Sequence, residues 1–144
     1  MAADKPSVAV SKRSPLKVAL ISTRLKKIAI DALIAPKEVG GGNLILNYTI
    51  TLEPNETPGT MGMSLQISGD GEDKDDPGTI PFKIDAVISG LFSITRKPTK
   101  IEAKNLSTDM ANYVLPILTD TIETTLTKCG YPNIQLLKSL PAEA

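Results

Sequence analysis

The chain has 144 residues, of which 41% are hydrophobic, and this length and composition are ordinary for one soluble domain. Sixteen basic and sixteen acidic residues cancel, which excludes the strong positive field of a general nucleic-acid-binding protein and leaves room only for a local basic patch. The sequence contains no histidine, so Ser-His catalysis, Cys-His catalysis and histidine metal sites are excluded.

The N-terminal residues 1–15 contain Lys, Ser, Pro and Ala with little periodicity, which predicts a flexible tail followed by one domain over residues 16–144. No charged and then apolar leader is found, and no apolar run approaches the length of about 18 residues that spans a membrane. The single cysteine, Cys129, cannot form an internal disulfide. These features predict a cytoplasmic protein without membrane insertion.

The first predicted strand lies in the segment from Leu16 to Ala35, where residues 25–31 alternate as in a half-buried strand. A triple glycine at residues 40–42 interrupts the pattern. Neither a lysine-serine pair nor a helix start follows it, so we interpret it as a turn and not as a phosphate-binding loop. Residues 44–52 then place an apolar side chain at every second position, which predicts a second strand.

Two further strands are predicted after the turn-forming residues 53–59. Residues 61–67 alternate as a third strand, and the apolar run 79–95 forms a fourth, with a bulge or bend at Ser89–Gly90. Residues 68–78 between them contain five acidic residues, two interior glycines and a proline, which predicts an exposed loop. Residues 70–76 lack the mid-loop glycine and final glutamate of an EF-hand, so we interpret them as a solvated loop and not as a calcium site. Short connections make the second, third and fourth strands an antiparallel meander.

A helix is predicted over residues 112–129, where apolar residues recur at steps of three or four. The members of this stripe are Leu115, Leu118, Ile122, Leu126 and Cys129. Side-chain oxygens between residues 107 and 112 suit a helix start, and Pro116 is tolerated only near such a start. Gly130 and Pro132 suit a helix end. One helix after four strands predicts an α+β fold with the helix on one sheet face.

No set of residues indicates a reaction. Cys129 lies at the helix end whose dipole does not stabilise a thiolate, and no histidine is available as its base. Asp120 and Glu123 lie on the polar side of the predicted helix, so we interpret them as a solvent-exposed face and not as an acid/base pair. We expect a protein that is not an enzyme and that has no cofactor or metal. An enzyme of unfamiliar type is the least favoured alternative.

Three blocks carry a family resemblance by their order and internal spacing. Residues 26–32 combine basic residues with alternating apolar positions and an acid, and residues 82–94 end in a Gly-Leu-Phe-Ser-Ile run. Residues 112–136 join a proline-opened helix, with Leu115–Pro116, to a Gly-Tyr-Pro turn, with Tyr131–Pro132, and to an alternating leucine tail. Together these blocks resemble the SecB family of protein-export chaperones.

The resemblance implies a four-stranded antiparallel sheet with a long connection to one C-terminal helix, assembled as a homotetramer that is a dimer of dimers. It also implies an ATP-independent holdase whose unfolded clients lie in apolar grooves between the sheet and that connection. Residues 95–111 then form the outer wall of the groove. Four residues are predicted to line it: Phe92, Ile94, Tyr113 and Leu115. The alternative role for each of them is in the core or a subunit interface.

Export-type members of the family present carboxylates to the translocation ATPase SecA, and Asp31 and Asp85 stand at matching positions. The chain departs from this pattern because it is neutral overall and has Lys27 where an acid is usual. The predicted function is therefore a chaperone for unfolded or nascent polypeptides, with protein export as one role and protection of a single partner, such as an antitoxin, as the other. A protein-interaction module without chaperone activity is the alternative from a different class.

Overall fold

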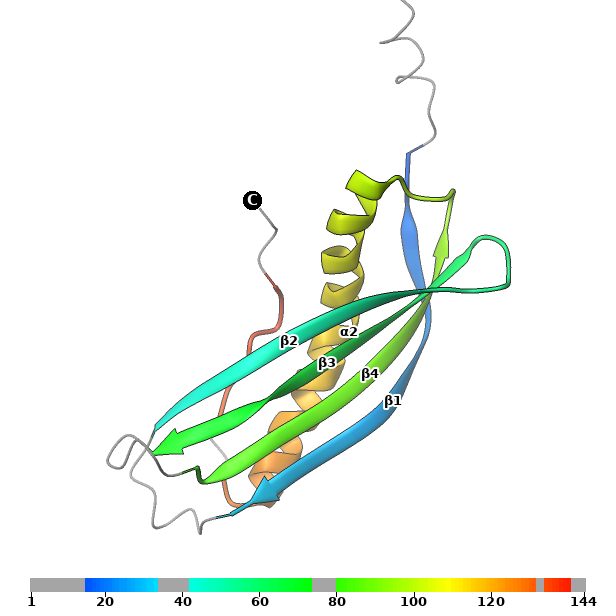
Figure 1. Ribbon diagram of the computed structural model, residues 1–144. Coiled ribbons are helices and arrows are strands. Elements are labelled where there is room, and N and C mark those ends of the chain that lie inside the picture. The colour runs from blue at the N-terminus through cyan, green and yellow to red at the C-terminus, as the bar shows by residue number, and fades with distance from the viewer. Residues whose placement is uncertain (1–14, 34–41, 74–79, 132–133, 141–144) are drawn as a thin grey trace, which may run out of the picture.

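The computed structural model describes residues 15–33, 42–73, 80–131 and 134–140 (Figure 1). The predicted N-terminal tail and most of the triple glycine lie outside these residues. The described residues form four strands and one helix: β1 (Val18–Ala32), β2 (Gly42–Pro54), β3 (Thr60–Asp73), β4 (Phe82–Ile94) and α2 (Lys100–Lys128). The predicted α+β fold class is confirmed.

The four strands form one antiparallel sheet in the order β1-β4-β3-β2. The predicted meander of β2, β3 and β4 is confirmed. Strand β1 returns to pair with β4, from Val18 opposite Ile94 to Ala32 opposite Phe82. The sheet is open, so β1 and β2 are its two edges and each leaves backbone groups without a strand partner on its outer side.

Strand β3 continues further than its sequence pattern predicts. It extends through Asp73, and Asp70 lies opposite Ile45 of β2, so the prediction of an exposed loop is wrong for residues 68–73. The reason is a glycine at an inward-facing position: a Cβ on Gly71 would lie 2.9 Å from ring atoms of Phe82. The apolar side chain that normally marks a strand is absent there because the Phe82 ring needs the space.

The irregularities of the sheet lie in β1 and not at Ser89–Gly90. The register of β1 on β4 shifts between Leu20 and Ser22 and between Leu25 and Lys27, whereas β4 pairs with β3 without interruption. Gly90 instead allows close packing, because a Cβ there would lie 2.8 Å from Cε1 of Phe92 and 3.1 Å from Cγ1 of Val114. Bulges in an edge strand also oppose pairing with foreign strands.

The hydrophobic core lies between α2 and the sheet face that α2 covers (Figure 1). Even-numbered residues of β4 and odd-numbered residues of β3 point toward the helix. The helix contributes its predicted stripe except for Cys129, which is the C-cap and is only partly buried. Its buried hydrophobic residues are Leu106, Met110, Ala111, Val114, Leu115, Leu118, Ile122 and Leu126. Each large apolar side chain buried in this way stabilises the fold by about 1.5–3 kcal/mol.

Helix α2 begins at Lys100, earlier than predicted, because Thr99 and Glu102 form a capping box. The Thr99 hydroxyl oxygen accepts from the N–H of Glu102 at 3.2 Å, and Oε1 of Glu102 accepts from the N–H of Thr99 at 2.9 Å. The two terminal guanidinium nitrogens of Arg96 donate to the Glu102 carboxylate, at 2.7 and 2.6 Å. These bonds lower the pKa of Glu102 to about 2. The connection after β4 is therefore short, and the long connection predicted over residues 95–111 is wrong, because residues 100–111 belong to α2. Their role as a groove wall stays a prediction.

Pro116 lies in the interior of the helix and not near its start. Proline has no backbone N–H, so the helical hydrogen bond from residue 116 to the carbonyl oxygen of Asn112 is missing. An interior proline lowers the stability of a helix by about 3 kcal/mol. The buried residues Leu115 and Leu118 on either side of it offset this cost. At the other end, Gly130 has a φ of 96° and the N–H of Tyr131 donates to the carbonyl oxygen of Leu126 at 2.8 Å, which closes the helix as predicted.

Candidate functional site

Helix α2 has two flanks beside its buried stripe, and they differ in composition. Tyr113 and Ile117, four positions apart, lie on one side, which we call the open flank. Asn112, Thr119 and Glu123 share the other side, which residues 134–140 cover and which we call the tail flank. The side chains of a helix project at steps of about 100° per residue, which places these two groups on opposite sides of the stripe.

The open flank presents aromatic and aliphatic surface. The Tyr113 ring packs edge-on against the Phe92 ring, with centroids 5.7 Å apart and an angle of 64° between the planes. Tyr113 remains 48% exposed and Ile117 43% exposed. Phe92 lies on the central strand β4, between Leu20 of β1 and Met61 of β3. The result is an apolar surface at the boundary between helix and sheet.

The structure brings together only part of the predicted client groove. Phe92 and Tyr113 are in contact, and Ile94 is partly buried against the core near the end of β4. Leu115 lies about 200° around the helix from Tyr113 and therefore does not reach the open flank. Phe92 and Leu115 have no exposed surface, so both belong to the core. Contact of any of the four with a client stays a prediction.

Two exposed residues of this region were missed by sequence reasoning. Ile117 follows Tyr113 by four positions, and this helical spacing could have predicted that the two side chains lie on the same side of the helix. Leu25, which is 43% exposed, lies opposite the buried Ile88 and so faces the helix side of the sheet at the β1 edge. No sequence pattern indicated the exposure of Leu25, because it depends on β1 being an edge strand.

The tail flank is covered by the C-terminal segment, which runs back beside α2 (Figure 1). The N–H of Leu136 donates to Oε2 of Glu123 at 2.7 Å. The side-chain amide of Asn112 accepts from the N–H of Leu140 at 2.6 Å and donates to its carbonyl oxygen at 3.3 Å. Leu136 is only 8% exposed. The segment is therefore attached through both backbone hydrogen bonds and an apolar side chain.

Glu123 binds the C-terminal segment through two of its residues, Leu136 and Lys138. Its Oε2 lies 2.8 Å from Nζ of Lys138, and Lys138 also donates to the hydroxyl oxygen of Thr119 at 3.3 Å. Burial raises the pKa of Glu123, but hydrogen bonds from Lys138 and from the N–H of Leu136 outweigh it, so the pKa is lowered overall. The interpretation as a plain solvent-exposed face holds for Asp120 and is wrong for Glu123, because the tail covers that position.

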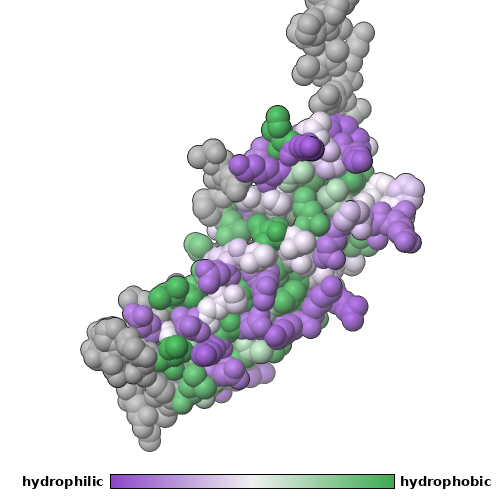
Figure 2. Space-filling model, in the orientation of Figure 1, coloured by the Kyte–Doolittle hydropathy of each residue, from purple (hydrophilic) through white to green (hydrophobic). Residues whose placement is uncertain are grey.

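The opposite face of the sheet carries both carboxylates predicted to contact SecA. Asp31 lies opposite Lys83, and Asp85 lies opposite Ala29 on the neighbouring strand. Hydrogen bonds from Lys27 at 2.5 Å and from Gln66 at 3.0 Å lower the pKa of Asp85. Figure 2 shows hydrophilic side chains interspersed among hydrophobic ones over this face. One of the two carboxylates is thus already bound within the chain.

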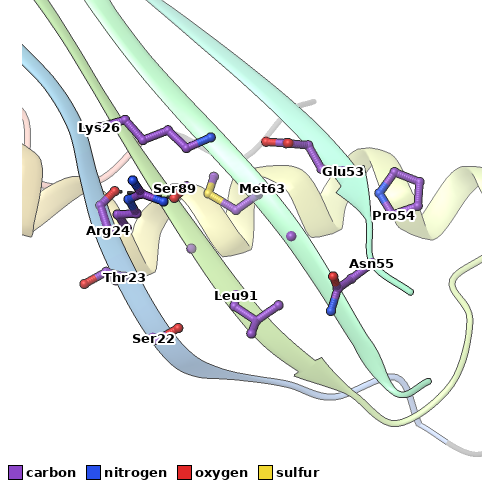
Figure 3. A pocket seen from close by; sticks show the side chains of 12 residues that line it. Ser22, Thr23, Arg24, Lys26, Glu53, Pro54, Asn55, Met63, Ser89 and Leu91 are labelled. Carbon is purple, nitrogen blue, oxygen red and sulfur yellow. Dashed lines mark hydrogen bonds between the residues drawn. The ribbon is translucent and has the colours of Figure 1, made fainter. Parts of the chain in front are cut away.

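A shallow depression of about 320 Å³ lies further along the same face (Figure 3). Arg24, Lys26 and Ser89 line it from β1 and β4, and Glu53 lies on the side of β2. Its lining is mostly polar, with Leu91 as one apolar contribution. Such a surface does not suit the apolar side chains of an unfolded polypeptide.

The part of the chain that the structure describes contains no group of three or more Cys, Asp or Glu side chains arranged to hold a metal ion. Among the same residues, no helix is both long enough and apolar enough to cross a membrane.

Comparison with known proteins was informative only at the level of structure. No family model and no curated protein match the chain. The fold is similar to that of a SecB-like chaperone from Mycobacterium tuberculosis, solved in complex with a ChAD peptide from the HigA1 antitoxin, with a TM-score of 0.70 and 14% identity over 88% of this chain and 92% of that chain.

A protein of unknown function from Streptococcus agalactiae has a TM-score of 0.36 and 18% identity, over 79% of this chain and 94% of that chain, and a similarity this low supports no argument. The fold that the three sequence blocks implied by their resemblance is confirmed by the mycobacterial structure. With its four-stranded antiparallel sheet and single C-terminal helix, the chain has the SecB-like fold.

Proposed function

We propose that the protein is an ATP-independent chaperone that binds unfolded or nascent polypeptides on the open flank of helix α2. The observation that supports this most is the half-exposed Tyr113 ring, which packs on Phe92. Ile117, one helical turn further on, adds exposed aliphatic surface on the same side. Exposed apolar surface beside a packed core is typical of protein-binding sites. An aromatic ring accepts many apolar partners, because it offers a large contact area with few rotatable bonds.

Between the two chaperone roles, we favour protection of a dedicated partner over protein export. The structurally similar mycobacterial chaperone was solved with a peptide from an antitoxin. In addition, a contact of SecA with Asp85 has to compete with the bonds that this carboxylate makes to Lys27 and Gln66. Asp31, the second predicted contact, lies opposite Lys83 and so shares its surroundings with a cation.

The predicted assembly as a dimer of dimers is part of this proposal. Strand β1 is an edge of the sheet and exposes Ile21 and Leu25. Its bulges oppose continuous strand pairing, so these two apolar side chains, and not the backbone, are the groups that favour association with a second copy. Light scattering on a sizing column measures the mass and distinguishes a monomer from a dimer or tetramer. The cytoplasmic location stays a prediction from the sequence.

Suppression of aggregation tests the chaperone function. We expect the protein to reduce light scattering from several chemically denatured clients during their refolding, at near-stoichiometric amounts. The double variant Tyr113→Ser/Ile117→Ser is expected to lose most of this effect. A matched control is Ile101→Ser, because Ile101 is 81% exposed and lies in the first turn of the same helix, far from Tyr113.

If no client is protected by the unchanged protein, the chaperone proposal is wrong and the interaction module is the better explanation. If Ile101→Ser and the double variant lose activity equally, the open flank is not the binding surface. Circular dichroism of each variant separates a lost surface from a lost fold.

A further inference from the structure

The C-terminal segment occupies the tail flank as a peptide without helix or strand structure, and it bends at residues 138–139. Side chains at residues 135 and 137–139 are exposed, whereas Ile134, Leu136 and Leu140 are at least partly buried against the core. One side of the segment therefore lies on the molecule while the other side faces solvent.

Recognition of the segment depends largely on its backbone. The N–H of Leu136 binds Glu123, and both the N–H and the carbonyl group of Leu140 bind Asn112. Every polypeptide repeats these backbone groups, so the three bonds do not require a particular sequence. The one deeply buried side chain is that of Leu136, so a single apolar residue completes the recognition.

The two helix residues hold the segment at two separate points. Asn112 and Glu123 are separated by about 16 Å along the helix axis, at 1.5 Å per residue. They bind Leu140 and Leu136, which lie on either side of the bend at residues 138–139. Because the bonded groups of the segment belong to its backbone, another polypeptide that follows the same path can make the same bonds.

We propose that the tail flank is a second polypeptide-binding site, at which Asn112 and Glu123 bind the backbone of an unfolded client segment. Residues 134–140 occupy this site until a client with an apolar residue at the position of Leu136 replaces them. The inference rests on the proposed chaperone function, because that function supplies the occupant. It differs from the open flank, where only side-chain contacts are available.

Peptide binding to variants of the full chain tests this site. The probe is a fluorescein-labelled peptide with the sequence of residues 134–140, followed by fluorescence anisotropy. Leu136→Ser is expected to strengthen binding of this peptide about tenfold, because a weakly attached tail leaves the site empty in a larger fraction of molecules. Leu137→Ser is the matched control, since Leu137 is 55% exposed. It should leave the affinity unchanged.

A second variant tests the same site without removing an apolar side chain. Lys138→Gln breaks the ion pair with Glu123 and is expected to strengthen peptide binding in the same direction. In the Leu136→Ser background, Asn112→Ala should return the affinity to that of the unchanged chain or below. Equal affinity in all these variants, or an equal effect of Leu137→Ser, overturns the proposal.

Competition identifies the occupant. A permanently unfolded client, such as a reduced and carboxymethylated protein, is expected to displace the labelled peptide from the Leu136→Ser variant. If it does not, while Tyr113 and Ile117 still support aggregation suppression, the second site is wrong and the proposed function stands. If the peptide binds as expected but no client is protected or bound anywhere, the assignment of clients to this site is wrong together with the proposed function.

Discussion

The two flanks of helix α2 bind in different ways, and the difference follows from the groups that each one offers. The tail flank carries Asn112 and Glu123, which bind backbone groups of the C-terminal segment, so this flank is occupied. The open flank offers the apolar surfaces of Tyr113 and Ile117. A buried backbone group needs a hydrogen-bond partner, whereas an apolar side chain needs only removal from water. One flank therefore suits backbone and the other suits side chains.

The largest expected effect concerns Phe92, the buried ring that packs against Tyr113 of the open flank. Phe92→Ala removes a ring that is fully buried, and we expect the free energy of unfolding to fall by about 3–5 kcal/mol. Tyr113→Ala, on the surface of the same ring pair, should cost less than half as much because its ring is half exposed. Urea denaturation of both variants measures the two values. Equal losses would mean that Tyr113 is a core residue and that the flank is not open.

The next effect tests how closely the sheet and helix approach below that flank. Gly90→Ala places a methyl group 2.8 Å from Phe92 and 3.1 Å from Val114, so we expect a loss of about 1–3 kcal/mol in the free energy of unfolding. Gly62→Ala is a useful comparison, since its nearest contact beyond its neighbours is at 3.3 Å, to the carbonyl oxygen of Glu53. A Gly90→Ala variant as stable as the unchanged protein would contradict this packing.

A smaller effect is expected when the tail flank is opened. Asn112→Ala removes two hydrogen bonds to Leu140 and should cost about 1–2 kcal/mol, mainly in local opening of the tail. Hydrogen exchange at Leu136 and Leu140 is expected to accelerate while the amides of the α2 core are unaffected. Acceleration throughout the helix would show that the tail and the helix unfold as one unit.

The smallest effect is a pH dependence of the tail attachment. The pKa of Glu123 is lowered from 4.5 because the hydrogen bonds of its charged form outweigh burial. Its stabilising contribution is therefore complete above pH 4.5 and is lost as the pH falls through the lowered pKa. Hydrogen exchange of the tail as a function of pH measures this loss. In Glu123→Gln, that pH dependence should disappear, and its persistence would assign it to another group.

Sequence reasoning was most accurate where one face of an element is continuously apolar. The alternation in β2, the apolar run of β4 and the stripe from Leu115 to Leu126 predicted those elements and the α+β fold. It failed at residues 68–73, where glycine accommodates a neighbouring ring, and at the helix start. The capping box of Thr99 and Glu102 was readable in the sequence, but the polar side chains at 107–112 and the position of Pro116 pointed to a later start.

The candidate site was less predictable than the fold. Tyr113 was identified with its partner Phe92, but Leu115 was grouped with them although it points to the other side of the helix. Glu123 was interpreted as solvent-exposed, because nothing in the local pattern of the helix shows that a later segment returns to cover it. Such errors are expected wherever the exposure of a residue depends on another part of the chain.

The amino-acid sequence by itself determined the periodic elements and their apolar faces, because periods of 2 and 3.6 residues are local properties of the backbone. Only the tertiary structure decided which segments meet. Lys27 binds Asp85 across 58 positions, and Leu140 binds Asn112 across 28, and neither contact leaves a local pattern in the sequence. The two flanks of α2 arise from such contacts, since one side of the helix is covered by the returning tail and the other is left open.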